Sequence, residues 1–285
     1  MAVAVVTDTT HYLPPALLAA HDVHQVSLYV GWPDGRDLRP ESAIDDLGRF
    51  YDELRTAATV PTTSQPSVGD MLAVYEPLLE SGHEIVSIHL SAGLSGTVGS
   101  AQQARAASSR PERITVLDSE TACGGLGLAV LAAARAASAG ASADEVTEAA
   151  RRTREQLRMW FCVDTLEYLR RGGRVGAAQS WIGGALKIKP ILALEREITP
   201  IERVRTAGRA FERMVEYMEA LEEAGRDGWA IQHIRALEQA ERLRERGLAV
   251  FGTAPLFVSE VGPVIGAHVG PGLLGVGGVA RSLLG

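Results

Sequence analysis

Lysine and cysteine are both scarce in this 285-residue sequence, which contains two of each. Cys123 and Cys162 are too few for a disulfide framework or a metal cluster, so we expect buried thiols in a reducing compartment. An excess of positive charge is also missing, because the formal net charge at pH 7 is −7. Nucleic acids and anionic membranes attract basic surfaces, so this charge argues against a general binder of either.

Long hydrophobic runs are missing as well. The longest, around residues 124–134, ends at Arg135 and is too short to cross a bilayer. The first residues have no basic segment before their apolar run, which is not the pattern of a signal peptide. We therefore expect a cytoplasmic protein with no stable membrane insertion and no nucleic-acid partner.

Several cofactor motifs are absent too. Neither Lys187 nor Lys189 follows the glycine that a P-loop requires, and Gly125 and Gly127 lack the third glycine of a dinucleotide-binding fingerprint. Histidine, cysteine and carboxylate residues show neither zinc nor calcium spacing. We expect no cofactor, no metal site, and neither nucleotide-hydrolysing nor redox chemistry.

The first half of the chain alternates between apolar strand patterns and helix patterns. The predicted strands are 2–6, 23–30, 84–90 and 113–117. The predicted helices are 14–20, 42–56, one that begins after a Ser67/Asp70 capping box, 98–105, and a helical region over 121–157. This order is typical of a mostly parallel sheet covered by helices.

The second half has a different rhythm, with adjacent strands and fewer helices. The predicted strands are 187–194, which enters a hairpin that turns at Pro200, then 229–234, 248–251, 257–260 and 264–269. A long helix is predicted over 209–224. We predict an α/β fold of two α/β domains, residues 1–157 with a mostly parallel sheet and residues 158–285 as an α+β domain with a mixed or antiparallel sheet.

Polar residues gather where strands of the first half end. The turn from Ser91 to Thr97 joins a strand to a helix, and helix starts attract anions through their unpaired N–H groups. The alternative is a serine that merely caps the helix. Asp8 and Thr9 follow the first strand, at the end of the sheet where α/β proteins bind ligands, or they simply cap the next helix.

Three further segments allow either a functional or a structural interpretation. Residues 61–67 are held extended by two prolines and carry hydroxyl and amide groups that suit a ligand site or an ordinary linker. His268 lies between glycines on a predicted strand, as an accessible side chain or an ordinary core histidine. The basic turn with Arg170, Arg171 and Arg174 suits a partner or phosphate site, or a helix C-cap.

A serine hydrolase is one hypothesis for these residues. Residues 93–97 approach the G-x-S-x-G nucleophile elbow, although Thr97 occupies the position of the second glycine. A Ser95–His268–Asp8 triad therefore stays open. A polar point beside much apolar surface also suits a fatty acid, because each buried methylene contributes about 0.8 kcal/mol.

Several segments, taken in order, resemble the DegV-like fatty-acid-binding proteins. They span nearly the whole chain and are residues 7–10 (TDTT), 63–67 (TSQPS), 94–97 (LSGT), 164–169 (DTLEYL) with 172–176 (GGRVG), 187–192 (KIKPIL) and 266–272 (GAHVGPG). The resemblance implies two α/β domains with a long-chain fatty acid bound between them. It also implies a separate fatty acid kinase subunit that converts the bound carboxyl group to an acyl phosphate, so the chain itself is expected to be a non-catalytic carrier.

The resemblance also implies roles for individual residues. Thr63, Ser95 and His268 match the family's carboxylate-binding residues. A supporting polar site is expected from Asp8, Thr9, Ser64, Gly96 and Thr97. Arg174 matches the kinase-facing or phosphate-facing surface, with Arg170 and Arg171 as possible substitutes.

Two departures from the family's pattern concern the shape of the pocket. Thr9 stands where the family more often has serine, and residues 123–127 replace a more usual serine-containing run. A serine hydrolase acting on a lipid ester or thioester, and a carrier of another anionic amphiphile without a kinase partner, remain the alternative functions.

Overall fold

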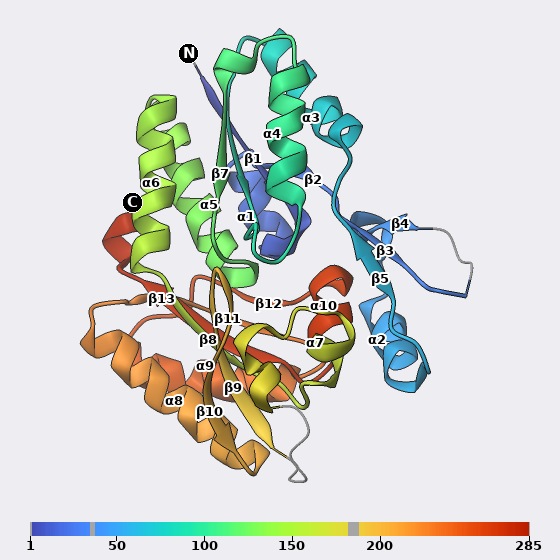
Figure 1. Ribbon diagram of the computed structural model, residues 1–285. Coiled ribbons are helices and arrows are strands. Elements are labelled where there is room, and N and C mark those ends of the chain that lie inside the picture. The colour runs from blue at the N-terminus through green and yellow to red at the C-terminus, as the bar shows by residue number, and fades with distance from the viewer. Residues whose placement is uncertain (1, 35–37, 182–187, 285) are drawn as a thin grey trace.

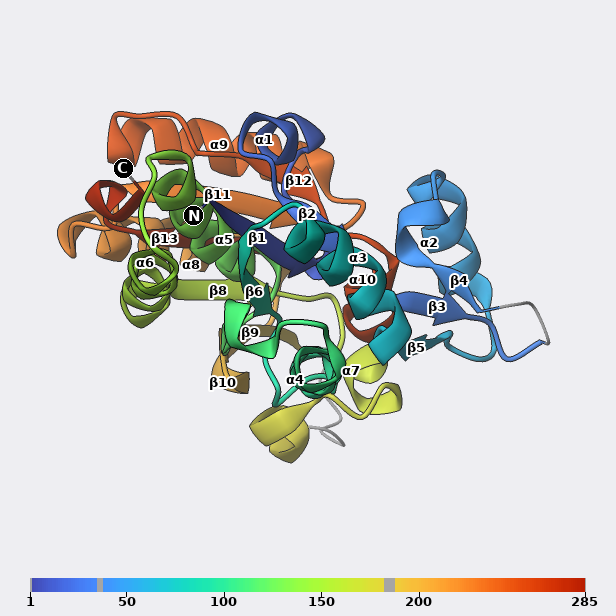
Figure 2. The same cartoon turned by 90° about the horizontal axis from the view of Figure 1, so that it is seen from above.

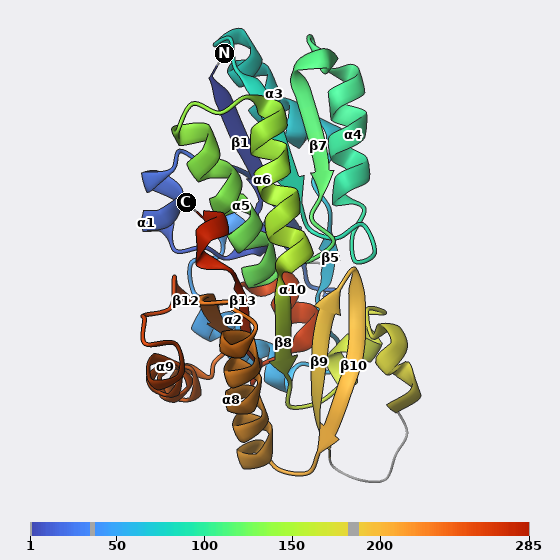
Figure 3. The same cartoon turned by 90° about the vertical axis from the view of Figure 1, so that its left-hand side faces the viewer.

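The computed structural model describes residues 2–34, 38–181 and 188–284. In it the two halves of the chain form two sheet-centred units, one above the other (Figures 1 and 3). Lys187, the predicted start of a strand and of one family-like segment, lies outside the described residues.

The upper unit contains a parallel sheet in the order β2-β1-β6-β7, which confirms the predicted parallel arrangement. Its strands are β1 (Val3–Asp8), β2 (His24–Val26), β6 (Glu84–His89) and β7 (Ile114–Asp118). Its helices are α1 (Pro15–Ala20), α3 (Val68–Glu80), α4 (Thr97–Ala107), α5 (Cys123–Ser138) and α6 (Ala143–Gln156). Helices α3 and α4 cover one face, and α5 and α6 cover the other (Figure 3).

Strand alternation divides the apolar residues of this sheet between its two faces. Val6 and Ile85 pack with residues of α3 and α4, whereas Val5 and Val86 pack with residues of α5 and α6. Both faces are covered, which explains why the strands read as nearly continuous apolar runs. The predicted capping box at Ser67 is confirmed at the start of α3.

The lower unit contains a mixed sheet in the order β10-β9-β8-β13-β11-β12. Its strands are β8 (Arg158–Cys162), β9 (Lys189–Glu195), β10 (Glu197–Val204), β11 (Gly228–His233), β12 (Val258–Glu260) and β13 (Leu274–Val279). Its helices are α7 (Glu167–Arg171), α8 (Ala207–Glu223), α9 (Leu237–Phe251) and α10 (Pro263–Val269). Only β11 and β12 pair in parallel among these described strands, so the predicted mixed or antiparallel sheet is confirmed.

The two faces of this sheet have different neighbours. Trp229 and Ile231 of β11 point into a core formed with α8 and α9. Ala230, the residue between them, belongs to the large core that continues into the upper unit. One face of the lower sheet therefore meets the end of the upper unit, where α5 contacts β11 and β13.

Three predictions about the second half are wrong. Residues 248–251 form the last turn of α9, because the helix continues to bury Leu243, Gly247 and Phe251. Residues 264–269 form α10, in which Pro263 occupies the first turn. The hairpin turns at Arg196, in the left-handed region with φ 56°, and Pro200 lies within edge strand β10, where a missing N–H is tolerated.

A small antiparallel sheet, which the sequence did not predict, projects from the upper unit (Figure 2). It comprises β3 (Tyr29–Gly31), β4 (Arg39–Pro40) and β5 (Thr62–Ser64) and is accompanied by α2 (Leu47–Thr56). The strand predicted over 23–30 is therefore two strands in different sheets. Tyr51 of α2 donates its hydroxyl to Val261 O at 2.6 Å, so α2 connects this small sheet to the segment just before α10.

The end of the described chain returns to the upper unit. Arg135 of α5 donates to the backbone oxygen of Leu284 at 2.5 Å, although Leu284 follows the last strand of the lower sheet. The domain boundary at 157/158 coincides with the start of β8 and remains a prediction. None of the helices that the structure describes is both long and apolar enough to cross a membrane.

Candidate functional site

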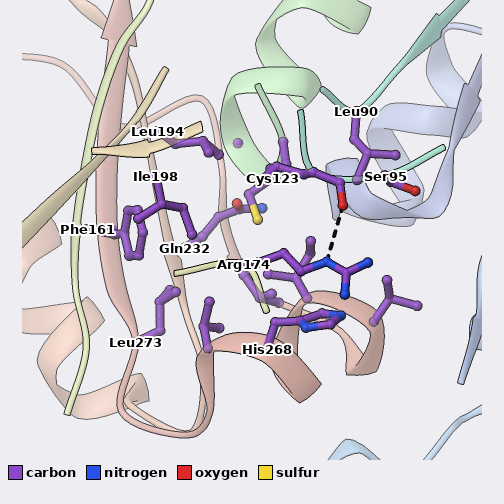
Figure 4. Close-up of a pocket in the computed structure, with 18 of the residues that line it drawn as sticks. Leu90, Ser95, Cys123, Phe161, Arg174, Leu194, Ile198, Gln232, His268 and Leu273 are labelled. Carbon is purple, nitrogen blue, oxygen red and sulfur yellow. Dashed lines mark hydrogen bonds between the residues drawn. The ribbon is translucent and has the colours of Figure 1, made fainter. Parts of the chain in front are cut away.

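A cavity of about 210 Å³ lies between the two units and is lined by residues of both. Its lining is mainly apolar: Leu28, Leu90, Leu94, Ala122 and Leu128 come from the upper unit, and Met159, Phe161, Leu169, Leu194, Ile198, Ala230, Val261, Val264, Ile265, Val269, Leu273 and Val276 from the lower unit. Figure 4 shows Ser95, Arg174 and His268 toward one side and Phe161, Leu194 and Leu273 toward the other. The cavity thus combines an apolar part with a polar end.

His268 of α10 connects the two units at the polar end. Its Nε2 atom lies 2.7 Å from Thr63 Oγ1 on β5. Its Nδ1 atom faces Gly172 so closely that an ideal Cβ at that glycine would clash with the ring. The predicted pair of Thr63 and His268, 205 residues apart, is therefore in direct contact.

Arg174 and Gln65 extend these contacts to the turn before α4. Arg174 donates through Nε to Leu94 O at 3.4 Å and through Nη1 to Gly172 O at 2.6 Å. The side chain of Gln65 lies against Gly96, where a Cβ would clash with it. A series of contacts therefore connects β5 with α10, Arg174 and the turn of Ser95. These contacts bring Thr63, Ser95, Gly96 and His268 to one end of the cavity.

The turn before α4 is shaped by close backbone approaches. Ser91 donates its hydroxyl to Arg196 O at 2.6 Å, so the tip of the β9–β10 hairpin packs on this turn. The N-cap of α4 is Gly96 and makes no side-chain capping bond, so the alternative that Ser95 caps the helix is wrong. Ser95 Oγ lies 2.9 Å from Thr97 Oγ1 instead. Ser95 lines the cavity, whereas Thr97 is not in the described lining and contacts the Ser95 hydroxyl.

The electrostatics of the polar end keep His268 neutral at pH 7. Burial, and secondarily the positive charge of Arg174, lower the pKa of His268 to about 4. Its buried Nδ1 atom has no hydrogen-bond partner among the described residues. A neutral ring whose Nε2–H donates to Thr63 Oγ1 leaves the Thr63 hydroxyl hydrogen available for a ligand oxygen.

Asp8 and Thr9 are not among the described residues that line the cavity. Asp8 is fully buried and accepts hydrogen bonds from Thr10 N at 3.0 Å, Leu90 N at 2.9 Å and His89 Nδ1 at 3.1 Å. Burial alone would raise the pKa of Asp8, but the His89 contact and the other bonds hold it below its ordinary value. The hypothesis of a Ser95–His268–Asp8 triad is therefore wrong, because Asp8 is hydrogen-bonded to His89 and His268 contacts Thr63.

Asp8 and Thr9 nevertheless shape the cavity through the backbone. Asp8 fixes the amide of Leu90, and Thr9 Oγ1 accepts from the amide of Leu28 at 3.3 Å. Both leucines line the cavity. Asp8 and Thr9 therefore contact residues of the lining without lining the cavity themselves, and their supporting role stays a prediction. Ser64 does line the cavity.

The three candidate arginines lie in different surroundings. Arg170 and Arg171 both pair with Glu167, at 2.7 and 2.6 Å, on the exposed face of α7. Those two hydrogen bonds lower the pKa of Glu167 to about 2. Arg174 alone of the three lines the cavity, among the residues that the structure describes.

A second hollow adjoins the polar end. It has a volume of about 440 Å³ and is lined by Ala92, Gly93, Leu94, Ser95, Gly96, Gly173, Arg174, Gly176, Glu197 and Ile198. Five residues line both spaces and so lie between the interdomain cavity and this recess: Leu94, Ser95, Gly96, Arg174 and Ile198.

Glu41 is a functional candidate that the sequence did not reveal. It is 6% exposed, and its Oε1 accepts from Tyr12 Oη at 2.9 Å and from Val264 N at 2.8 Å. It therefore holds the first turn of α10, the helix that carries His268. Burial raises the pKa of Glu41 to about 7, against the opposing effect of its hydrogen bonds. A lone glutamate after a proline gives no local sequence signal for this role.

The raised pKa of Glu41 predicts that the stability of the folded protein falls as pH rises. Because the folded protein holds this proton more tightly than the unfolded chain, stability from this group is complete below pH 4.5 and lost as pH rises to about 7. The free energy of unfolding of wild type, relative to Glu41→Gln, should fall by about 3 kcal/mol between pH 4.5 and 8. Urea unfolding of both proteins across this range measures it, and a constant difference would contradict the assignment.

Among the described residues, no group of three or more His, Cys, Asp or Glu side chains is arranged to hold a metal ion. Cys123 lines the cavity at the start of α5 with its pKa raised by burial, and Cys162 is buried. Both cysteines are free thiols; Cys162 is buried as expected, whereas Cys123 is only partly buried.

Comparisons with known proteins give a consistent result. A family model described as "Uncharacterised protein, DegV family" matches residues 2–281. A DegV domain-containing protein of Streptomyces coelicolor is 44% identical over 96% of this chain and 97% of its own length, and Protein DegV of Bacillus subtilis is 37% identical over 97% and 98%.

Solved structures agree with these sequence matches. The Bacillus subtilis DegV crystal structure, described as a fatty acid binding protein, has a TM-score of 0.87 at 34% identity and covers 98% of this chain and 99% of that one. A DegV family protein from Thermus thermophilus, described through its fatty acid binding, has a TM-score of 0.86 at 32% identity over 98% and 99%.

Proposed function

Because the chain belongs to the DegV family, whose solved members include fatty-acid-binding proteins, we propose that it binds a long-chain fatty acid between its two units. The observation that carries the proposal is the interdomain cavity, which joins an extensive apolar lining to a polar end. Each methylene moved from water into such a lining contributes about 0.8 kcal/mol, so the chain provides affinity and the polar end provides orientation.

The carboxylate is proposed to bind at Thr63 and Ser95. Both residues line the same cavity, and hydrogen bonds to a charged acceptor are stronger than neutral ones. Neutral His268 orients the Thr63 hydroxyl, and Arg174 adds a positive charge at the same end. The start of α4, directly after Ser95, adds the positive end of a helix dipole.

The carrier role extends this proposal to a partner. We assign the phosphoryl transfer to a separate fatty acid kinase, in which a carboxylate oxygen of the bound ligand attacks the terminal phosphorus of a nucleoside triphosphate and the diphosphate leaves. The recess beside Ser95, Gly96 and Arg174 supports this role, because it lies next to the proposed carboxylate position. Among the described residues, Ser95 Oγ contacts Thr97 Oγ1, His268 Nε2 contacts Thr63 and His89 contacts Asp8, which supports assigning the chemistry to a partner. We place both proteins in the cytoplasm.

Native mass spectrometry of the purified protein tests the binding step. We expect one added mass of a long-chain fatty acid, or its appearance after addition of palmitate or oleate. A protein that carries no fatty acid and takes up neither would contradict the proposal.

The carrier role is tested by adding a fatty acid kinase and ATP to the loaded protein. The expected product is acyl phosphate, trapped as the hydroxamate by hydroxylamine. Kinase with free fatty acid but without this chain is the control, and equal hydroxamate in that control would refute the carrier role.

A further inference from the structure

Gln232 places an amide within the apolar part of the cavity. It lies on β11, is 5% exposed, and lines the cavity (Figure 4). Its Nε2 donates to His11 O at 3.2 Å and to Ser259 Oγ at 3.0 Å, and it lies 3.5 Å from Tyr12 O. Backbone oxygens only accept hydrogen bonds, so the amide nitrogen must face them and the orientation of the amide is fixed.

The other end of this amide is unpaired. Gln232 Oε1 is buried and has no hydrogen-bond partner among the described residues. Leaving a buried acceptor unsatisfied is costly, and native proteins retain such groups rarely. An ideal Cβ on Gly124 would lie only 3.3 Å from this oxygen, which is a tight contact, so the lack of a side chain at Gly124 lets the start of α5 come close to the amide. Gly124 lines the same cavity.

The start of α5 supplies hydrogen-bond donors at the same place. Cys123 and Gly124 are the first residues of this 16-residue helix, and their N–H groups have no partner within the helix. The preceding Ala122 makes no side-chain capping bond. Both residues line the cavity, and Gly124 lies against the Gln232 amide. An acceptor and a helix start with free donors therefore meet inside an otherwise apolar lining.

We propose that Gln232 and the first turn of α5 bind a hydroxyl group carried on the acyl chain, so that the preferred ligand is a monohydroxylated long-chain fatty acid. This inference rests on the proposed fatty-acid binding. A hydroxyl both donates and accepts, so it satisfies Gln232 Oε1 and receives an N–H from Cys123 or Gly124. An oxo group only accepts and leaves Gln232 unpaired, and an unsubstituted chain satisfies neither group.

The test compares stearate with a series of monohydroxystearates whose hydroxyl is stepped along the chain, and with the matching oxostearates. Displacement of a fluorescent fatty acid measures each affinity. For wild type we expect one hydroxyl position to bind about tenfold more tightly than stearate, equivalent to about 1.4 kcal/mol, while its oxo counterpart shows no gain.

Two variants connect the preference to Gln232. Gln232→Met keeps the length of the side chain but removes the acceptor, so the ratio of hydroxystearate to stearate affinity should fall to about one. Ser259→Ala removes a partner of Nε2 but leaves Oε1 in place, so it should retain the preference. Equal binding of all C18 ligands by wild type, or a preference that survives in Gln232→Met, would overturn the hydroxyl inference alone. Failure of stearate and every hydroxystearate to bind would overturn the proposed function with it.

Discussion

Replacing Thr63 and Ser95 together by alanine is expected to weaken palmitate binding by about a hundredfold or more. Each hydroxyl is proposed to donate to the ligand carboxylate, and a hydrogen bond to a charged group is worth about 1.5–3 kcal/mol. Both side chains line the polar end of the cavity, and His268 lies 2.7 Å from the Thr63 hydroxyl. Isothermal titration of wild type and the double variant measures the loss.

Chain-matched ligands show whether this loss belongs to the head group. Wild type should bind palmitate more tightly than hexadecanol, and the double variant should bind the two almost equally. Thr62→Ala is the matched control, because Thr62 is an exposed neighbour of Thr63 on the same strand and does not line the cavity. An unchanged preference for palmitate in the double variant would refute the carboxylate assignment.

Ala230→Phe is expected to remove most of the affinity for long chains. Ala230 is 4% exposed and faces the cavity from β11, so a phenyl ring there occupies space proposed for the acyl chain. Excluding about six methylenes costs about 5 kcal/mol, or more than about 1,000-fold in affinity. Isothermal titration with palmitate measures the loss, and thermal unfolding of the variant checks that it is folded. Ala230→Val adds a smaller side chain at the same position and should weaken binding less.

The dependence on chain length separates a filled cavity from general damage. In wild type, affinity should rise about fourfold with each added methylene, which corresponds to about 0.8 kcal/mol. In Ala230→Phe the rise should stop at a shorter chain, while fatty acids below that length bind as in wild type. A variant that weakens all chain lengths by the same factor would contradict the assignment of this region to the acyl chain.

Local features of the fold could be predicted because their causes are local. The capping box at Ser67 depends on two residues three positions apart, and it is present. The parallel strands of the upper unit are apolar throughout because both faces of their sheet are covered. Residues 264–269 were assigned to the wrong type of element, because a short apolar run fits a buried helix as well as a strand.

The sequence by itself determined the family and the two kinds of sheet, and the family resemblance predicted that Thr63, Ser95 and His268 belong together. These features depend on an ordered set of motifs and on apolar periodicity, both of which are visible along the chain. The hydrogen-bond partners of the buried polar groups were decided only by the tertiary structure. Asp8 pairs with His89 rather than with His268, and Gln232 reaches the backbone of His11 across 221 residues. Such contacts depend on how the two units pack, and no local pattern records that packing.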